Sequence, residues 1–519
     1  MLDDNGLDRC RFSRRDFLRV GGGAFGAIAL GTLPAWRSDA RHRFRKDPFT
    51  LGIASGDPSS TGAVLWTRLA PADRPPDGRV PVDWEIALDD GFRRIARRGS
   101  ALAVPELAHS VHVELDGLEP ARSYWYRFTA GDVTSAVGHL RTAPAGDVDR
   151  VRFAFVSCQN YQDGLYTAFE HLAAEEVDVV VHLGDYIYEN GPAENRPRRH
   201  DAPEIVTLDD YRRRYALYKG DAMLQAVHAR HAFVTTWDDH EVDNNYAANI
   251  AEERAPVSGD AFLQRRAAAY QAYYEHMPLR RMMMPSGPDL RLYRRLDYGR
   301  LLRFHVLDTR QYRTDQPCGD GFRASCSAAS DPSATILGDA QERWLLEGLS
   351  ESPAGWNVLA NQVPVSPVYS IRDGERAVSM DKWSAYLASR RRLIDAMHAR
   401  PSLNPVVITG DVHVSWVADV KTDFENAASN TVATELVGTS ISSGGDGQAM
   451  SPGGEALLAT NPHVSFFNGH RGYVRCDVTR ERLHADYRTL PYVTRPGAPI
   501  ATAASFVTEA GRPGAQRDG

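Results

Sequence analysis

The chain has 519 residues, of which 43% are hydrophobic and 24% are charged. This composition excludes a mainly disordered or collagen-like chain, and the length allows two to four domains of about 150 residues each. With 60 Lys and Arg against 67 Asp and Glu, the net charge is -7. A net negative chain has no overall electrostatic attraction to nucleic acid, so we expect no specific nucleic acid binding.

The first 38 residues are predicted to be a twin-arginine signal peptide. Residues 13–19, SRRDFLR, precede a Gly- and Ala-rich apolar stretch over residues 20–34. That stretch is shorter than the roughly 20 residues a membrane-spanning helix needs, so we expect no stable membrane anchor. The alternative is a chance arginine pair before a buried helix. We expect the twin-arginine export machinery to be a partner and the protein to be periplasmic or secreted.

Residues 48–143 are predicted to form an all-β domain of the fibronectin type III-like kind. Short runs that alternate apolar and polar residues, such as GAVLWTRL, VPVDWEIAL and SYWYRFTA, are separated by Gly, Pro and Asp. Leu118-Glu119-Pro120 followed by Tyr124 has the spacing of a tyrosine corner, in which a tyrosine hydroxyl bonds to nearby backbone. Residues 142–149 have the composition of a linker.

Residues 150–500 are predicted to form an α/β domain, with residues 501–519 as a C-terminal tail. VRFAFVSC and VDVVVHLGD are continuous β-branched runs, as in strands buried on both faces, and the helical stretch GLYTAFEHLAAEE lies between them. Similar strands alternate with amphipathic helices further along. We therefore expect a large α/β body with substantial insertions.

Polar side chains cluster where four of these predicted strands end. The motifs are Ser157-Cys158-Gln159, Gly184-Asp185-Tyr186-Ile187-Tyr188-Glu189, Trp237-Asp238-Asp239-His240-Glu241 and Gly410-Asp411-Val412-His413. Ligands of open α/β sheets bind at the carboxyl ends of the strands. Because buried carboxylates need a compensating charge, a convergence of aspartates at these ends favours bound cations.

Taken singly, each of these motifs has a simpler explanation. Asp185 could belong to a turn, and residues 238–241 could be a solvated helix start with an acidic cap. His413 could be a hydrogen-bonded core residue, and Cys158 a small buried hydrophobe. The ordered set is far more specific than any one member.

The order of the motifs resembles that of the PhoD-type alkaline phosphatases, a family of the calcineurin-like metallophosphoesterase superfamily. From residue 49 to about residue 490 the chain carries FTLGIASGDPSSTGAVLWTRLAP, SCQNYQDGLYTAFEHLA, HLGDYIYEN, TTWDDHEVDNNY, ITGDVHVSW and GHRGYVRCDV in the family's order. The resemblance implies an α/β metallophosphoesterase double β-sandwich flanked by helices, preceded by the fibronectin type III-like domain. Two segments depart from the pattern: Trp383-Ser384-Ala385-Tyr386 stands where relatives commonly have Trp-Asp-Gly-Tyr, and Asn361-Gln362 fits loosely.

The resemblance also implies a centre with two kinds of metal ion. One, Fe3+, would be surrounded by Cys158, Asp185, Tyr188 and His413. Thiolate and phenolate donors suit this ion because they stabilise the higher oxidation state of iron. Asp185 would bridge to Ca2+, or to another divalent metal, with Asp239 and Asp411 as further oxygen ligands.

The implied function is an exported hydrolase that releases phosphate from small phosphomonoesters and phosphodiesters through attack by metal-activated hydroxide. His240 would contact the phosphate or protonate the leaving oxygen. Asn244, Arg310 and Arg471 are candidate substrate-side residues, with solvated surface positions as the alternative. Two other functions stay open: a phospholipase D-like diesterase of the same family, and a noncatalytic binding protein stabilised by metals.

Cys318 and Cys326 are predicted to form a local disulfide. They lie in the Gly-, Ser- and Asp-bearing loop PCGDGFRASC, and an exported protein meets an oxidising compartment. The alternative is two unrelated loop cysteines. Cys476, in the predicted strand GYVRCDV, is expected to stay reduced.

Replacing Arg14 and Arg15 together by lysine is expected to leave the protein in the cytoplasm, because the export pathway recognises the arginine pair. Immunoblots of cytoplasmic and exported fractions would measure the distribution. Unchanged export of the double variant would contradict the signal assignment.

Overall fold

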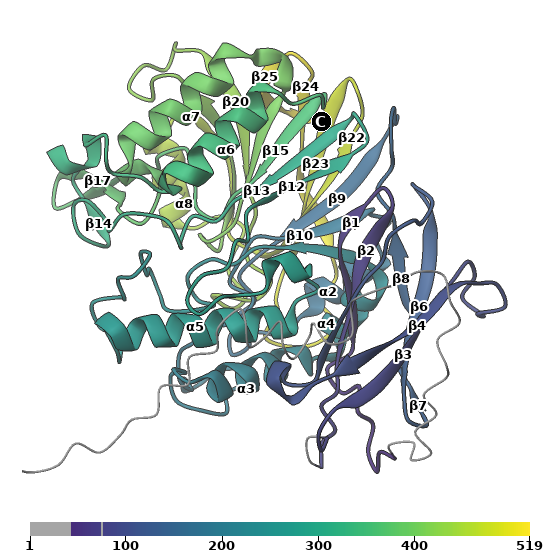
Figure 1. Ribbon diagram of the computed structural model, residues 1–519. Coiled ribbons are helices and arrows are strands. Elements are labelled where there is room, and N and C mark those ends of the chain that lie inside the picture. The colour runs from purple at the N-terminus through teal and green to yellow at the C-terminus, as the bar shows by residue number, and fades with distance from the viewer. Residues whose placement is uncertain (1–42, 74–75, 519) are drawn as a thin grey trace, which may run out of the picture. The chain divides into compact units, whose positions relative to one another are not determined.

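Two large β-sheets pack face to face in the computed structural model, which describes residues 43–73 and 76–518 (Figure 1). Helices cover the outer faces of both sheets. The predicted signal peptide, residues 1–38, lies outside the described residues. Across the residues that are described, no helix has the length and apolar character needed to cross a membrane.

The first sheet has ten strands in the order β25-β24-β23-β22-β9-β10-β11-β1-β2-β5. Parallel pairing joins β9, β10, β11 and β1, and the remaining neighbours are antiparallel. The bounds are β1 Ile53–Ser59, β2 Gly62–Arg68, β5 Ser110–Glu114, β9 Val151–Val156, β10 Val179–His182, β11 Ala232–Thr235, β22 Arg471–Val478, β23 Arg482–Leu490, β24 Ala501–Glu509 and β25 Arg512–Asp518.

The second sheet has seven strands in the order β12-β13-β15-β18-β20-β19-β21. Its central strands β13, β15, β18 and β20 are parallel. The bounds are β12 Arg294–Tyr298, β13 Leu302–Val306, β15 Trp356–Ala360, β18 Pro405–Thr409, β19 Ser415–Lys421, β20 Thr431–Val437 and β21 Val464–Asn468.

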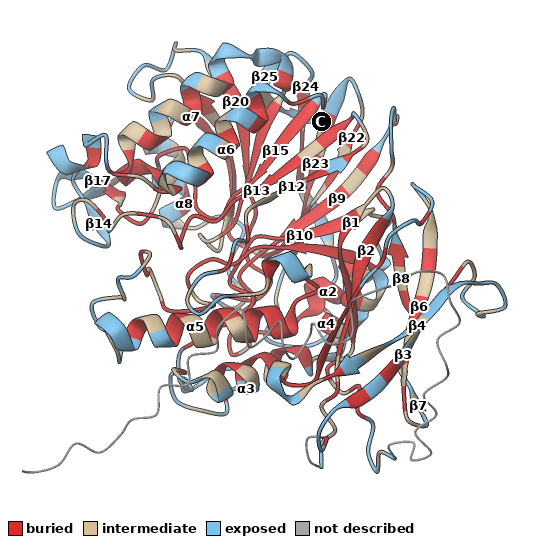
Figure 2. Cartoon of the chain, in the orientation of Figure 1, coloured by how far each residue is buried: buried red, intermediate tan, exposed pale blue. Residues whose placement is uncertain are grey.

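The central strands are apolar on both faces because each face is covered (Figure 2). On β9, Phe153 points into the core between the sheets, where its ring packs edge-on against Phe304 with 5.1 Å between centroids. Its neighbour Ala154 belongs to the core beneath the helices. This two-sided burial explains the unbroken β-branched runs of the sequence.

Four helices pack on the ten-stranded sheet and two on the seven-stranded sheet. The first group is α2 Thr167–Ala174, α3 Leu208–Lys219, α4 Ala222–Arg230 and α5 Gly259–His276, and the second is α6 Gly338–Ser350 and α7 Leu387–Ala399. The remaining elements are α8 Pro452–Thr460, the small sheet of β14 Phe322–Arg323, β16 Ser370–Arg372 and β17 Glu375–Ser379, and the 3-10 helices η2 Pro105–Leu107, η3 Arg281–Met283, η4 Ser327–Ser330, η5 Trp383–Ala385 and η6 Pro401–Leu403.

The N-terminal all-β domain shares a sheet with the α/β body. Its own five-stranded sheet packs on β1, β2 and β5 through a core that includes Leu65 and Phe128. In the same domain the tyrosine corner predicted from the sequence is present: the Glu119 amide donates to the Tyr124 hydroxyl at 2.9 Å. The five strands are β3 Val80–Ala87, β4 Ile95–Ala103, β6 Ser123–Ala130, β7 Val133–Thr134 and β8 Gly138–Arg141.

β1 pairs in parallel with β11, with Ser55 opposite Ala232 and Gly56 opposite Phe233. The predicted boundary near residue 143 is therefore a change of architecture without a break in the sheet. A sequence pattern reveals strands but not which strand they pair with, so this junction was not predicted.

The prediction of a C-terminal tail is wrong for residues 501–518, because they form β24 and β25. β24 pairs with β23 and buries Ala504 and Phe506 in the core between the sheets. Small and polar residues dominate this segment, so its apolar signal is weak, and antiparallel backbone pairing supplies the order that side-chain burial alone would not.

Lys219, the last residue of α3, is buried between the all-β domain and the α/β body with 2% exposure. Its Nζ lies 4.2 Å from the ring centroid of Trp66 and 5.4 Å from that of Tyr186. Within residues 43–73 and 76–518, no carboxylate lies at ion-pair distance from this ammonium group. Burial lowers the pKa of Lys219 to about 7.

Replacing Lys219 by methionine is expected to stabilise the protein near neutral pH. An unfolded lysine keeps its proton up to a pKa of about 10.4, so the cost of burying the charge is full below pH 7 and disappears as pH rises toward about 10. Cation–π contact offsets part of this cost, which leaves an expected gain of about 1–3 kcal/mol at about pH 6. Urea unfolding at about pH 6 and about pH 10 measures it, with the exposed Lys46→Met variant as control. An equal or larger gain at the higher pH would contradict the assignment.

Candidate active site

Two overlapping groups of possible metal ligands lie where strands of both sheets end. Ligand atoms of Cys158, Asp185 and His413 all lie within 4.8 Å of one another, and so do those of Asp185, Asp239 and His240. These residues follow β9, β10 and β11 of the first sheet and β18 of the second. Asp185 belongs to both groups, which is the position of a carboxylate able to bridge two cations.

The backbone holds four candidate ligands in the left-handed region. The φ angles are 58° at Cys158, 57° at Asp185, 66° at Asp411 and 58° at His413. This conformation is unfavourable for residues with a Cβ, and such strain persists where surrounding structure fixes it, often at functional sites. Here the Cys158 amide donates to the Gly184 carbonyl at 3.0 Å, which ties the ends of β9 and β10 together.

Gly184 allows these loops to approach each other closely. Its φ is 115°, and a Cβ at this position would lie 2.5 Å from Asp238 Cβ. Any other residue would therefore force the loop after β10 away from the loop after β11.

Tyr188 connects the first ligand group through its hydroxyl. It donates to Asp185 Oδ2 at 2.9 Å and lies 3.1 Å from His413 Nε2, and it accepts from Ser443 Oγ at 2.8 Å. Burial and the nearby Asp185 charge raise the pKa values of Cys158 and Tyr188 well above their usual range. A thiolate and a phenolate here thus require a cation beside them.

The surroundings of Asp185 also fit a bound metal ion. Asp185 is 2% exposed, and its Oδ1 atom is buried without a hydrogen-bond partner in the described structure. Burial raises the pKa of Asp185, as do the charges of Asp239 and Asp238, although His240 opposes them. A buried carboxylate oxygen with no donor is costly unless a cation occupies the position facing it.

His240 is held by a buried carboxylate, Glu189, which was not predicted from the sequence as a site residue. Its Nδ1 lies 2.7 Å from Glu189 Oε2, and its ring stacks on Tyr188 with 4.1 Å between centroids. Burial opposes protonation of the imidazole, but Glu189, Asp185 and Asp239 raise its pKa well above the usual value. The geometry leaves Nε2 as the free nitrogen for transferring a proton or contacting a phosphate. Glu189 was visible in the motif HLGDYIYEN, but nothing local marked it as the partner of His240.

Asp239 stays ionised although it is buried. Its Oδ2 accepts a hydrogen bond from the backbone N–H of Asn245 at 2.8 Å, and Arg310 Nη2 lies 3.6 Å from Oδ1. Burial alone would raise its pKa, but the Arg310 and His240 charges lower it. Asp239 is thereby available as an anionic oxygen donor.

Arg310 is buried among carboxylates, and its assignment as a substrate-side residue stays a prediction. It is 0% exposed, with Nε 2.5 Å from Asp238 Oδ1 and Nη1 2.7 Å from Asp381 Oδ1. Carboxylates on both sides hold the guanidinium away from solvent. Burial and the Asp239 and Asp411 charges raise the pKa of Asp238 to about 7, although Arg310 opposes the shift.

Asp381 and Lys382 extend this charge network to Asp411, and neither residue was predicted from the sequence. Lys382 Nζ forms an ion pair with Asp411 Oδ2 and lies 3.4 Å from Asp381 Oδ2. Asp381 also accepts from Arg313 at 2.6 Å. These residues directly precede Trp383, where the chain departs from the family pattern, and that departure was the only local signal.

Arg471 and Asn244 support neighbouring residues. The Arg471 guanidinium donates to the His413 carbonyl and, at 2.8 Å each, to the carbonyls of Gly445 and Gly469. Burial and the Arg471 charge lower the pKa of His413 to about 3, which keeps its imidazole neutral and able to bind a metal. The Asn244 amide donates to Glu189 Oε1 at 3.0 Å. These contacts are all to protein groups, so they do not test the prediction that Arg471 and Asn244 bind substrate.

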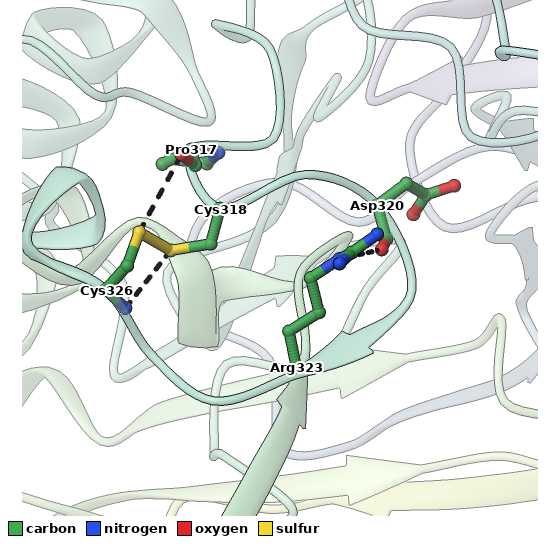
Figure 3. The surroundings of a disulfide bond; sticks show 5 residues. All are labelled: Pro317, Cys318, Asp320, Arg323 and Cys326. Carbon is green, nitrogen blue, oxygen red and sulfur yellow. Dashed lines mark hydrogen bonds between the residues drawn. A yellow bond between two sulfur atoms is a disulfide. The ribbon is translucent and has the colours of Figure 1, made fainter.

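A disulfide joins Cys318 and Cys326, whose Cα atoms are 5.9 Å apart (Figure 3). Within its loop, Asp320 accepts from the Asn245 side chain at 2.9 Å and 3.1 Å. The backbone N–H of Asn245 donates to Asp239. The cross-linked loop therefore helps to hold a candidate metal ligand in place. Cys476 is buried on β22 as a free thiol.

Comparisons with known proteins match nearly the whole chain. The family model for PhoD-like phosphatase matches residues 153–487, and that for the PhoD-like phosphatase N-terminal domain matches residues 35–144. The chain is 48% identical to alkaline phosphatase D of Bacillus subtilis (strain 168), over 99% of this chain and 91% of that protein. A solved structure of PhoD is 50% identical, covers 92% of this chain and 93% of its own, and gives a TM-score of 0.89.

Proposed function

The chain belongs to the PhoD-like phosphatase family and is a phosphatase, and from this premise we propose that it releases phosphate from phosphomonoesters and phosphodiesters at the site around Asp185. The observation that carries the proposal is the place of Asp185 in both groups of possible ligands. The homology to a phosphatase sets aside the noncatalytic alternative. Hydrolysis of p-nitrophenyl phosphate and bis-p-nitrophenyl phosphate, assayed alongside metal analysis, tests the proposal.

The proposed cofactors are Fe3+ and Ca2+. Cys158, Asp185, Tyr188 and His413 would hold the iron, and Asp185 and Asp239 would hold calcium or another divalent metal. Asp411 is the further proposed oxygen ligand of the second metal, although it belongs to neither group and pairs with Lys382. When bound, these ions supply Lewis acidity toward water and toward the phosphoryl oxygens. Support comes from the unpartnered Oδ1 of Asp185 and from the mixture of thiol, phenol, imidazole and carboxylate donors.

The proton transfer is assigned to His240. The Glu189 carboxylate accepts from Nδ1, which fixes the ring orientation and stabilises the imidazolium form. Stacking on Tyr188 limits rotation of the ring. The proton on Nε2 is then available to the oxygen of the departing alcohol, whose need for protonation grows with its basicity.

We extend the proposal to architecture and location. The facing sheets support a metallophosphoesterase double β-sandwich, and the tyrosine corner supports a fibronectin type III-like assignment for the N-terminal domain. The SRRDFLR motif supports export to the periplasm or the medium, for which the arginine replacement described above is the test.

The His240→Ala variant is expected to keep its metal content while kcat falls roughly 100-fold to 10,000-fold, the range for loss of a positioned acid. Esters with good leaving groups should lose less than alkyl esters. Glu189→Gln should show the same leaving-group trend with a smaller loss, roughly tenfold, because the ring keeps a hydrogen-bond acceptor but loses the anion beside it. Exposed Glu253→Gln is the matched control. Loss of metal from His240→Ala would make this residue a ligand instead of an acid.

Asp185→Asn is expected to remove both metals together with the activity. Tyr188→Phe tests the iron site alone. The phenylalanine keeps the stack on His240 but removes the phenol oxygen, so a visible charge-transfer band from iron–tyrosinate should disappear. Elemental analysis and absorption spectra of both variants measure these outcomes. A colourless, fully loaded wild type, or unchanged iron and spectrum in Tyr188→Phe, would favour a site with calcium or other divalent ions alone.

A further inference from the structure

A cavity of about 520 Å³ lies beside α7, away from the candidate metal ligands. Its walls come from one side of α7, from β17 and from the loop that follows β19. The lining residues that carry the argument are Tyr369, Arg376, Leu387, Arg390, Phe424 and Glu425. The volume lies within the range of pockets that hold small organic ligands.

Arg390 lines this cavity, and one nitrogen of its guanidinium is unsatisfied. Its Nη1 is buried and has no hydrogen-bond partner in the described structure. No carboxylate among residues 43–73 and 76–518 lies within ion-pair distance of the side chain, and its Cζ lies 5.2 Å from the centroid of the Phe424 ring. A cation in such a position is costly unless an anion joins it.

The other two arginines of the cavity already have acceptors. Arg376 pairs with Glu425 at 2.6 Å, and Arg391 pairs with Asp395 at 2.8 Å. The second oxygen of Glu425 accepts from the Tyr369 hydroxyl at 3.0 Å. Glu425 already accepts from two donors, so it acts on Arg390 only through longer-range attraction, as does Glu435, and neither forms an ion pair with it.

The walls around Arg390 are apolar and aromatic. Val378 and Ile394 are buried at 5% and 3% exposure, and Leu387 and Pro367 also line the cavity. Arg376 stacks over the Tyr369 ring at 3.4 Å, which adds a flat surface to one side. A ligand that satisfies both features has an acidic head group and an aromatic or apolar body.

We propose that this cavity binds a small aromatic anion, with its acidic head on Arg390 and its apolar body against Phe424, Leu387 and Ile394. The site is separate from phosphate release, because none of the candidate metal ligands lines it. The head group can be a carboxylate, sulfonate or phosphate, since each accepts hydrogen bonds from a guanidinium.

The test uses the full-length protein and the fluorescent probe 1-anilinonaphthalene-8-sulfonate. Wild type should give a saturable fluorescence increase, and N-phenyl-1-naphthylamine, which has the same rings without the sulfonate, should bind roughly tenfold or more weakly. Arg390→Gln should weaken sulfonate binding by a similar factor and remove the preference for it. Arg390→Lys keeps the charge and should bind between the two.

The matched control is Arg391→Gln, which changes the neighbouring, already paired arginine of the same cavity. It should bind the probe as wild type does. p-Nitrophenyl phosphate hydrolysis should match wild type in all three variants, and each should unfold in a single cooperative thermal transition, which shows that the fold is intact. The proposal is overturned if wild type shows no saturable signal, if Arg390→Gln binds equally well, if the neutral probe binds as tightly, or if Arg391→Gln loses as much.

Discussion

Repulsion among buried carboxylates is the constraint on which the rest of the site depends. Acidic groups gather at the strand ends, and burial raises the pKa of Glu241 to about 8 and that of Asp238 to about 7. Arg310 and Lys382 offset only part of this charge. Cations bound from solution would complete the balance, so the repulsion among these carboxylates would favour metal binding.

The two-sheet architecture is what makes such a concentration of charge possible. Rigid strands buried on both faces fix the loops that follow them. The buried Glu241 carboxylate accepts hydrogen bonds from the backbone N–H groups of Asp185, Tyr186 and Asp238. These bonds tie the loop after β10 to the loop after β11. Side chains that repel one another are thus held close by backbone that cannot move apart.

Features encoded locally were predictable from the sequence. Strand-end motifs such as residues 184–189 combine a buried run with the polar residues that follow it, and the tyrosine corner depends on residues five apart. Contacts between distant segments were not. Glu189 with His240 and Lys382 with Asp411 are pairs whose members carry no local mark of each other. The surroundings of Arg310 were not predictable for the same reason, because nothing next to it in the sequence marks the carboxylates that it contacts.

The parallel pairing of β1 with β11 gives the N-terminal domain a part in assembling the catalytic body. β1 is synthesised before β11, so an edge able to pair with β11 is present when the later strand is made. Contacts between such distant segments are slow to form, and a chain that lacked the domain would present β11 as an open edge for pairing with other molecules. A chain truncated at the apparent domain boundary would then be prone to aggregate, even though every residue around Asp185 would remain in it.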